Sequence, residues 1–267
     1  MELKRLLNIK YIIIVCAALV LNIILFMFQA TAGGNKINED SKRDLRIRTE
    51  YIENYKSNIQ NIVDRAEKLK KQRLFSNPES FSYKNIIKTG KDYEKLININ
   101  LSADNSKAVR AISKYSMFIG ISAILTLLLM NNLFKERDNN MWQLTYMSKN
   151  GRAYLGLVRI ADIFIISLIQ HCLLYITVVC VSFILFGGLG DLYNPIQNIS
   201  EFGQCTLVIN KAEYLIADFL LTYLSVVVAT SIIYMLMNVF RNRKNVFIGT
   251  GAVSYTHLRA HETSLHL

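Results

Sequence analysis

The sequence predicts an all-α, multi-pass membrane protein, a helical bundle with an additional helical domain outside the membrane. Apolar residues gather in four windows, each long enough to cross a bilayer, which takes roughly 20 residues of helix. Between the first two windows lies a charged stretch, residues 32–115, with a seven-residue apolar repeat. The chain has 267 residues, of which 52% are hydrophobic, 19% are charged and only two are proline. This composition excludes a disordered chain and a disulfide-framed miniprotein.

The predicted membrane spans are Tyr11–Phe28, Ser116–Phe134, Ile160–Gly187 and Leu215–Phe240, and a further apolar run begins at Val246. The last two windows are longer than a bilayer core requires, so we expect tilt or protrusion there. Ala30-Thr31-Ala32 resembles a signal-peptide cleavage site, which leaves a cleaved signal peptide as an alternative for the first window.

Basic residues beside the windows predict the orientation. Three Lys/Arg precede the first window, five lie in residues 135–159 and three follow the fourth window, whereas residues 188–214 hold one Lys and three acidic residues. Because short basic flanks stay in the cytoplasm, we expect a membrane protein with a cytoplasmic N-terminus. The predicted order is 1–31 (cytoplasmic N-terminus and first span), 32–115 (outer domain), 116–134 (second span), 135–159 (cytoplasmic link), 160–187 (third span), 188–214 (outer link), 215–240 (fourth span), 241–251 (cytoplasmic link and start of a fifth span) and 252–267 (tail).

The outer domain carries a heptad pattern. Glu39–Arg73 has neither Gly nor Pro, and two sets of apolar residues repeat every seven positions: Leu45, Ile52, Ile59 and Ala66, and then Tyr55, Ile62 and Leu69. The pattern predicts a long helix that packs against another helix, either in a dimeric coiled coil or in a hairpin within the chain. Asn77-Pro78 ends it. Residues 81–101 carry no assignable pattern, and residues 102–115 should form a helix that leads into the second span. The domain is either a solvated cap or a ligand-recognition domain.

Charge and motifs argue against nucleic-acid binding and catalysis in this chain. The net charge is +11, but residues 32–115 account for +7 (18 Lys/Arg against 11 Asp/Glu) and most of the remainder borders the windows. Three of the four Cys lie inside windows and none forms a CxxC pair, so neither a disulfide framework nor a metal site is expected. The chain has no phosphate-binding loop, HExxH or GxSxG motif. We therefore expect no catalytic residue, no cofactor and no enzyme activity.

Three polar residues inside the windows are candidate functional residues. Gln170 and His171 lie in the middle of the third window, and Asp218 lies near one end of the fourth. Ionisable residues within a membrane usually face a bundle interior or a cavity. For His171 two interpretations stay open, a hydrogen bond between helices or a role in a substrate path. Asp218 is close enough to an interface for its carboxylate to reach water.

Residues 135–159 form the segment most suited to a soluble partner. Charge follows the second window directly, an apolar run surrounds Trp142, the only Trp of the chain, and Asn150-Gly151 predicts a turn. A short amphipathic helix here could dock into a groove of a soluble subunit with Trp142 as its anchor. The alternative is an aromatic residue that anchors the segment at the membrane interface.

The last residues have a separate origin. Val253–Thr263 reads VSYTHLRAHET, which resembles a translated sequencing adapter. We expect the native sequence to stop near Gly251, in a protein that continues beyond it. The three His residues of this tail therefore form no metal site.

Several segments resemble permease subunits of type-2 ABC exporters of Gram-positive bacteria. They are FKER at Phe134–Arg137, KNGR at Lys149–Arg152, FSYKNIIKTGKDYEKL in the outer domain, and GDLYNPIQNISEF at Gly190–Phe202 with Cys205-Thr206. The resemblance covers most of residues 1–251. It implies a coupling helix between the second and third spans that meets a separate ABC ATP-binding subunit, with Glu136, Trp142, Gly151 and Arg152 as coupling residues. It also implies six spans, a second permease copy or paralogue, and a location in the bacterial cell membrane.

The large outer domain departs from the simplest members of that family and is similar instead to four-span mechanotransmitting permeases. The sequence thus predicts a transporter subunit for an amphiphile or a peptide. A mechanotransmitter that acts on an extracytoplasmic partner and a membrane sensor or adaptor are the alternatives.

Overall fold

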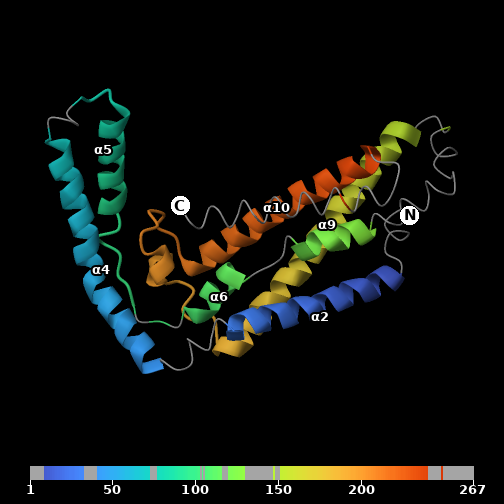
Figure 1. Ribbon diagram of the computed structural model, residues 1–267, viewed down its shortest axis with the longest axis horizontal. Helices are drawn as coiled ribbons and strands as arrows, with labels where there is room; N and C mark the ends of the chain where they lie inside the picture. Colours follow the sequence, from blue (N-terminus) through green and yellow to red (C-terminus); the bar gives the residue numbers. More distant parts are fainter. Residues whose placement is uncertain are drawn as a thin grey trace. The chain divides into compact units, whose positions relative to one another are not determined.

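The computed structural model describes residues 9–32, 41–72, 77–102, 104, 106–115, 120–129, 147, 151–239 and 248. The elements are helical throughout, and no strand occurs among these residues, which confirms the all-α class. In chain order they are α2 (Ile9–Ala32), α4 (Ser41–Lys70), α5 (Phe81–Glu94), α6 (Lys107–Tyr115), α9 (Gly151–Phe186), the short 3-10 helices η2 (Ile196–Asn198) and η3 (Ser200–Phe202), and α10 (Lys211–Val239) (Figure 1).

Three helices are long and apolar enough to cross a membrane. They are Ile9–Thr31 within α2, Gly156–Phe186 within α9, and α10. A fourth span results if α6 and the helical stretch Gly120–Leu129 form one broken crossing. The helices begin earlier than the predicted windows, α9 at Gly151 and α10 at Lys211, because helical backbone bonding continues into polar flanks that hydropathy does not mark.

The chain divides into two compact units. Unit 1 comprises residues 1–28, 115–181 and 219–267, and unit 2 comprises residues 29–114 and 182–218. Both segments that the sequence places outside the membrane, 32–115 and 188–214, therefore fall almost wholly within unit 2.

Unit 1 has a small apolar core shared by four helical segments. Its buried side chains are Tyr11 of α2, Ala123 and Leu129 of the stretch Gly120–Leu129, Ile163 and Ile166 of α9, and Ile233 of α10. Large apolar side chains also cover the outward faces, for example Ile13 (63% exposed) and Leu221 (64% exposed). A bundle that is apolar both inside and outside suits a lipid environment rather than water.

A polar contact joins two of these helices. Asn22 is the single polar residue of the first predicted window, and it is buried. Its Nδ2 donates to the carbonyl oxygen of Leu174 at 3.3 Å and lies 3.4 Å from Oγ1 of Thr177, both in α9. In hydrocarbon the amide has no water to bond, so such a contact stabilises the pairing of α2 with α9.

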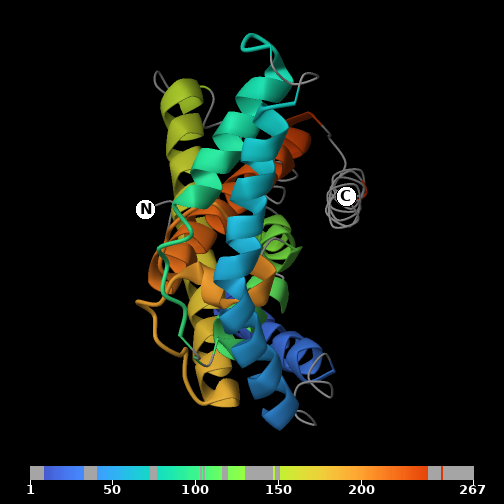
Figure 2. The ribbon, with the colours of Figure 1, turned by 90° about the vertical axis from the view of Figure 1, so that its left-hand side faces the viewer.

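Unit 2 is built on a helical hairpin. α4 and α5 run side by side, as both ribbon views show (Figures 1 and 2). The heptad face of α4 is the buried one, since Tyr55 and Ile59 form a core with Leu96 just after α5. Gly90 lies against Ala66, and a Cβ built there would make an ordinary van der Waals contact of 3.5 Å with the Cβ of Ala66. Of the two partners that the heptads allowed, the structure therefore contains the hairpin within the chain.

α5 itself was not predicted, although its start carries recognisable signals. The Asn77 side chain accepts a hydrogen bond from the backbone of Glu79 at 3.1 Å, which forms a turn around Pro78. Ser80 then caps the helix, because its Oγ accepts from the backbone N–H of Tyr83 at 3.2 Å. No residue of α5 is fully buried, which explains why no apolar periodicity was visible in the sequence.

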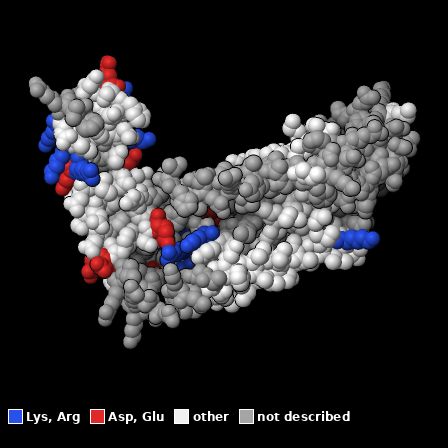
Figure 3. Space-filling view, in the orientation of Figure 1, with Lys and Arg blue, Asp and Glu red and all other residues white. Residues whose placement is uncertain are grey.

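Charged side chains are unevenly distributed over the helices. In the space-filling view the described Lys, Arg, Asp and Glu gather mainly over the hairpin, whereas the described surface of the long helices is largely uncharged (Figure 3).

Candidate functional site

The predicted coupling residues are only partly described. Glu136 and Trp142 lie outside the described residues. Gly151 and Arg152 form the first turn of α9, where their backbone is helical. Asn150 lies outside the described residues, so the expected turn at Asn150-Gly151 stays a prediction, as does the coupling role of these four residues.

His171 forms a polar pair with Thr222 between α9 and α10. The His171 side chain is fully buried, and its Nε2 lies 3.3 Å from the carbonyl oxygen of Phe219 and 3.2 Å from Oγ1 of Thr222. The rings of Tyr175, Phe219 and Tyr223 surround it at centroid distances of 6.2, 5.0 and 5.8 Å. His171 therefore makes the helix–helix hydrogen bond that one of its two interpretations requires.

Gln170 is also buried, but within the described part of the chain its side-chain amide lacks hydrogen bonds like those of His171. Its side chain is 3% exposed, and neither Nε2 nor Oε1 has a hydrogen-bond partner among the described residues. A buried amide without partners is unfavourable in protein and more so in hydrocarbon. Such a group in a membrane helix is a candidate for contact with a transported molecule or with another subunit.

Asp218 is the third intramembrane candidate. It is half-buried in α10 and belongs to unit 2, whereas Gln170 and His171 belong to unit 1. Gln170 and His171 are neighbours in the sequence, and the structure buries both of them.

Unit 2 contains a buried ionic site that the sequence did not reveal. We call it the clasp and define it by Asp104, Asn194 and Lys211. Lys211, the first residue of α10, is fully buried, and its Nζ donates to the carboxylate of Asp104. The same carboxylate accepts from Nδ2 of Asn194 at 3.2 Å and from the backbone N–H of Asp191 at 3.1 Å.

The electrostatics of the clasp favour an ionised Asp104. Burial by itself raises the pKa of this carboxyl, but the hydrogen bonds from Lys211, Asn194 and the Asp191 backbone outweigh burial and hold the pKa below its usual value. A buried lysine with no opposite charge would be strongly unfavourable, so the pair stays ionised together. The clasp thereby fixes the start of α10 to the segment between α5 and α6.

A second set of contacts ties the outer link to the hairpin. Gln197 of η2 is buried, and its Nε2 donates to the carbonyl oxygens of Cys205 at 3.0 Å and Leu207 at 2.7 Å. The Tyr51 hydroxyl of α4 donates to the Gln197 carbonyl at 3.0 Å, and burial, with smaller contributions from Tyr55 and Glu201, raises the pKa of Tyr51 to about 12. α4 is thus bound to a segment that lies far away in sequence.

The end of α9 is held in the same unit. Ser182 Oγ donates to the carbonyl oxygen of Ala108 in α6 at 3.0 Å. α9 then stops at Gly187 and Gly188, whose φ angles of 70° and 127° suit glycine, and the N–H of Gly188 bonds the carbonyl of Phe183 at 2.9 Å. Unit 2 consequently binds α4, α6, the end of α9 and the start of α10 through specific polar contacts.

Metal chemistry finds no support in the described part of the chain. No group of three or more His, Cys, Asp or Glu residues there could hold a metal ion, and Cys16, Cys172, Cys180 and Cys205 are free thiols.

One weak signal for the clasp was present in the sequence. Lys211 is the only basic residue of an otherwise acidic link, and it directly precedes an apolar window. Its partner Asp104 lies 107 positions away, in a stretch without periodicity, so the pairing itself was not readable. No protein-family model, curated protein or solved structure matches this chain.

Proposed function

We propose that this chain is the membrane-spanning subunit of an ABC transporter that moves an amphiphile or a peptide. A separate subunit hydrolyses ATP, and its motion enters through residues 135–159. The proposal rests on the resemblance described above, on three helices that are long and apolar enough to cross a membrane, and on the form of α9.

The observation that carries the proposal is the continuity of α9. This helix extends from Gly151 to Phe186, 36 residues without a break. At 1.5 Å per residue it is about 54 Å long, well beyond the roughly 30 Å of a bilayer core. Its first turn holds the predicted coupling residues Gly151 and Arg152, and its last turns are anchored by Ser182. A displacement applied at one end of such a helix is transmitted to the other end.

The test is stimulated ATP hydrolysis. The chain is co-expressed with the ATP-binding protein encoded beside it, co-purified and reconstituted in lipid. We expect Trp142→Ala and Arg152→Glu to reduce the stimulation of ATP hydrolysis, whereas Lys56→Glu, a change of the same charge on exposed α4, should leave it intact. Full stimulation in both Trp142→Ala and Arg152→Glu would contradict the coupling role.

Orientation is tested separately. We place the N-terminus and Lys149 in the cytoplasm because of the basic flanks. In a variant without Cys16, Cys172, Cys180 and Cys205, Lys149→Cys should resist a membrane-impermeant thiol reagent added to intact cells. Lys56→Cys is the matched position in the predicted outer domain and should react. Labelling of Lys149→Cys from outside would reverse the topology.

A mechanotransmitter is the second candidate, and the clasp is the observation that favours it. Asp104 and Lys211 join the region beside the hairpin to the start of α10, so a rearrangement of unit 2 would act on a membrane helix. A disulfide tests this idea. The position of a Cβ on Gly90, 3.5 Å from that of Ala66, suits a cysteine pair in Ala66→Cys/Gly90→Cys. A mechanotransmitter that separates α4 from α5 would lose activity on oxidation and regain it on reduction, whereas a transporter with a static cap would be unaffected.

A further inference from the structure

A row of four lysines lies along one face of α5 and its C-cap. Lys84, Lys88, Lys91 and Lys95, which we call the lysine row, are spaced by four, three and four residues, and all are exposed. This spacing places them on one helix face. The opposite face contacts α4, since Gly90 approaches Ala66 and Tyr93 packs on the core of Tyr55, Ile59 and Leu96. The lysine row therefore points away from the hairpin partner.

Three of these lysines have no counter-charge in the described part of the chain. Lys95 Nζ pairs with Asp92 at 2.9 Å, but no ion pair joins Lys84, Lys88 or Lys91 to a described acidic residue. Like charges at these spacings destabilise an isolated helix. A bound anion would relieve this repulsion, and an exposed row of ammonium groups is complementary to a negatively charged ligand.

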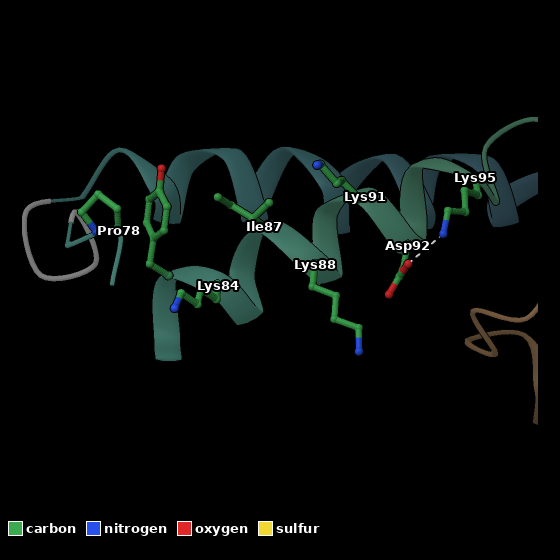
Figure 4. A pocket seen from close by; sticks show the side chains of 8 residues that line it. Pro78, Lys84, Ile87, Lys88, Lys91, Asp92 and Lys95 are labelled. Carbon is green, nitrogen blue, oxygen red and sulfur yellow. Dashed lines mark hydrogen bonds and ion pairs between the residues drawn. The ribbon is translucent and has the colours of Figure 1, made fainter. Parts of the chain in front are cut away.

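The lysine row borders a hollow that also has an apolar part. The hollow has a volume of about 500 Å³ and is lined by Pro78, Tyr83, Lys84, Ile87, Lys88, Lys91, Asp92 and Lys95. Figure 4 shows Pro78 toward one end, Ile87 near the middle, and Lys91, Asp92 and Lys95 toward the other end. This volume falls within the range of small-molecule sites, and it is too small for a folded partner.

We propose that this hollow binds a single anionic amphiphile. Lys84, Lys88 and Lys91 hold its phosphate or carboxylate head, and Pro78, Tyr83 and Ile87 contact its apolar body. A ligand with a negative head and an apolar body matches both halves of the lining, whereas a simple anion would use only the lysines. The ligand is a freely dissolved molecule rather than the surface of a bilayer, because the hollow accommodates one molecule.

The test uses the full chain in nanodiscs of zwitterionic lipid and needs no ATPase, so its outcome is independent of the proposed transport function. Hexyl phosphate is titrated calorimetrically, with methyl phosphate and hexanol as probes of the head and the tail alone. Empty nanodiscs give the background. We expect saturable binding of one hexyl phosphate per chain, and weaker binding of both partial probes.

Matched variants distinguish a built site from general charge. Lys84→Gln/Lys88→Gln/Lys91→Gln should weaken hexyl phosphate binding at least about tenfold. Lys56→Gln/Lys68→Gln/Lys71→Gln removes three exposed lysines outside the row and should leave it unchanged. Ile87→Ser should weaken hexyl phosphate but not methyl phosphate. Equal weakening in both triple variants, equal affinity for the two phosphates, or binding to anionic phospholipid vesicles alone would each overturn the proposal.

Discussion

Lys211, at the first position of α10, is fully buried and donates to the carboxylate of Asp104, 107 residues earlier in the chain. The aspartate side chain is itself only 11% exposed. Two opposite charges that are removed from water together depend on each other, because either one alone would remain buried without compensation. This relationship makes the pair a sensitive probe of unit 2.

Lys211→Met should be strongly destabilising. The substitution keeps most of the side-chain volume but leaves the Asp104 carboxylate without its cation, so we expect a loss of about 3–5 kcal/mol in the free energy of unfolding. Denaturant titration in mild detergent, followed by circular dichroism, measures it. Adding Asp104→Asn to Lys211→Met should recover part of the loss, since the two sites are coupled. Strictly additive losses would show that the pair does not interact as the structure indicates.

Acid should weaken unit 2 through the same carboxylate. The folded-state pKa of Asp104 lies below its unfolded value, so its stabilisation is fully present above the unfolded pKa of about 3.9 and is lost as the pH falls through the lower folded-state pKa. Unfolding midpoints between pH 6 and pH 2 should therefore decline more steeply in the parent chain than in Asp104→Asn. Parallel pH profiles would assign the acid sensitivity to other carboxylates.

Gly203→Ala should separate the outer link from α4. A Cβ on Gly203 would overlap the Tyr51 hydroxyl, which donates to the Gln197 carbonyl, so the tyrosine must move. We expect a cost of about 1–3 kcal/mol, as for other overpacked sites. Gly156→Ala is the matched control, because a Cβ there meets nothing within 4 Å. Comparable stability of the Gly203→Ala and Gly156→Ala variants would contradict this contact.

Gln170→Leu should stabilise the protein and impair its activity. Replacing a buried amide that lacks described partners by an apolar side chain of similar size removes its desolvation penalty, for a gain of about 1–3 kcal/mol. Thermal unfolding in detergent measures the gain, and substrate-stimulated ATP hydrolysis measures the activity. Gln197→Leu is the contrasting control, since that amide donates two hydrogen bonds and its loss should destabilise. Destabilisation by Gln170→Leu would mean that the amide is already satisfied.

Local patterns predicted the parts of this fold that depend on local chemistry. The heptads from Leu45 to Leu69 marked a helix with one apolar face, and the structure buries Tyr55 and Ile59 on that face. Asn77-Pro78 marked the break after α4. α5 was missed because it carries no fully buried residue and therefore no strong periodicity.

The candidate sites were also predicted only in part from the sequence. Gln170 and His171 were visible because polar residues are rare in apolar windows, whereas the contact of His171 with Phe219 and Thr222 needed the packing of α9 on α10. The lysine row was not predicted because residues 81–101 had no assigned secondary structure. Without a helix, the lysines of this segment could not be placed on a common face. Only the α5 helix shows that its lysines share a face.

By itself the sequence determined that this chain is helical and carries helices apolar enough to span a membrane, because hydropathy and heptad spacing are properties of neighbouring residues. Tertiary structure decided which surfaces meet: α4 with α5, Asp104 with Lys211, and Tyr51 with the backbone of Gln197. These contacts join residues that are far apart in the chain, and their free energy depends on burial and geometry that appear only when the helices pack. The composition of a segment does not indicate which other segment it packs against.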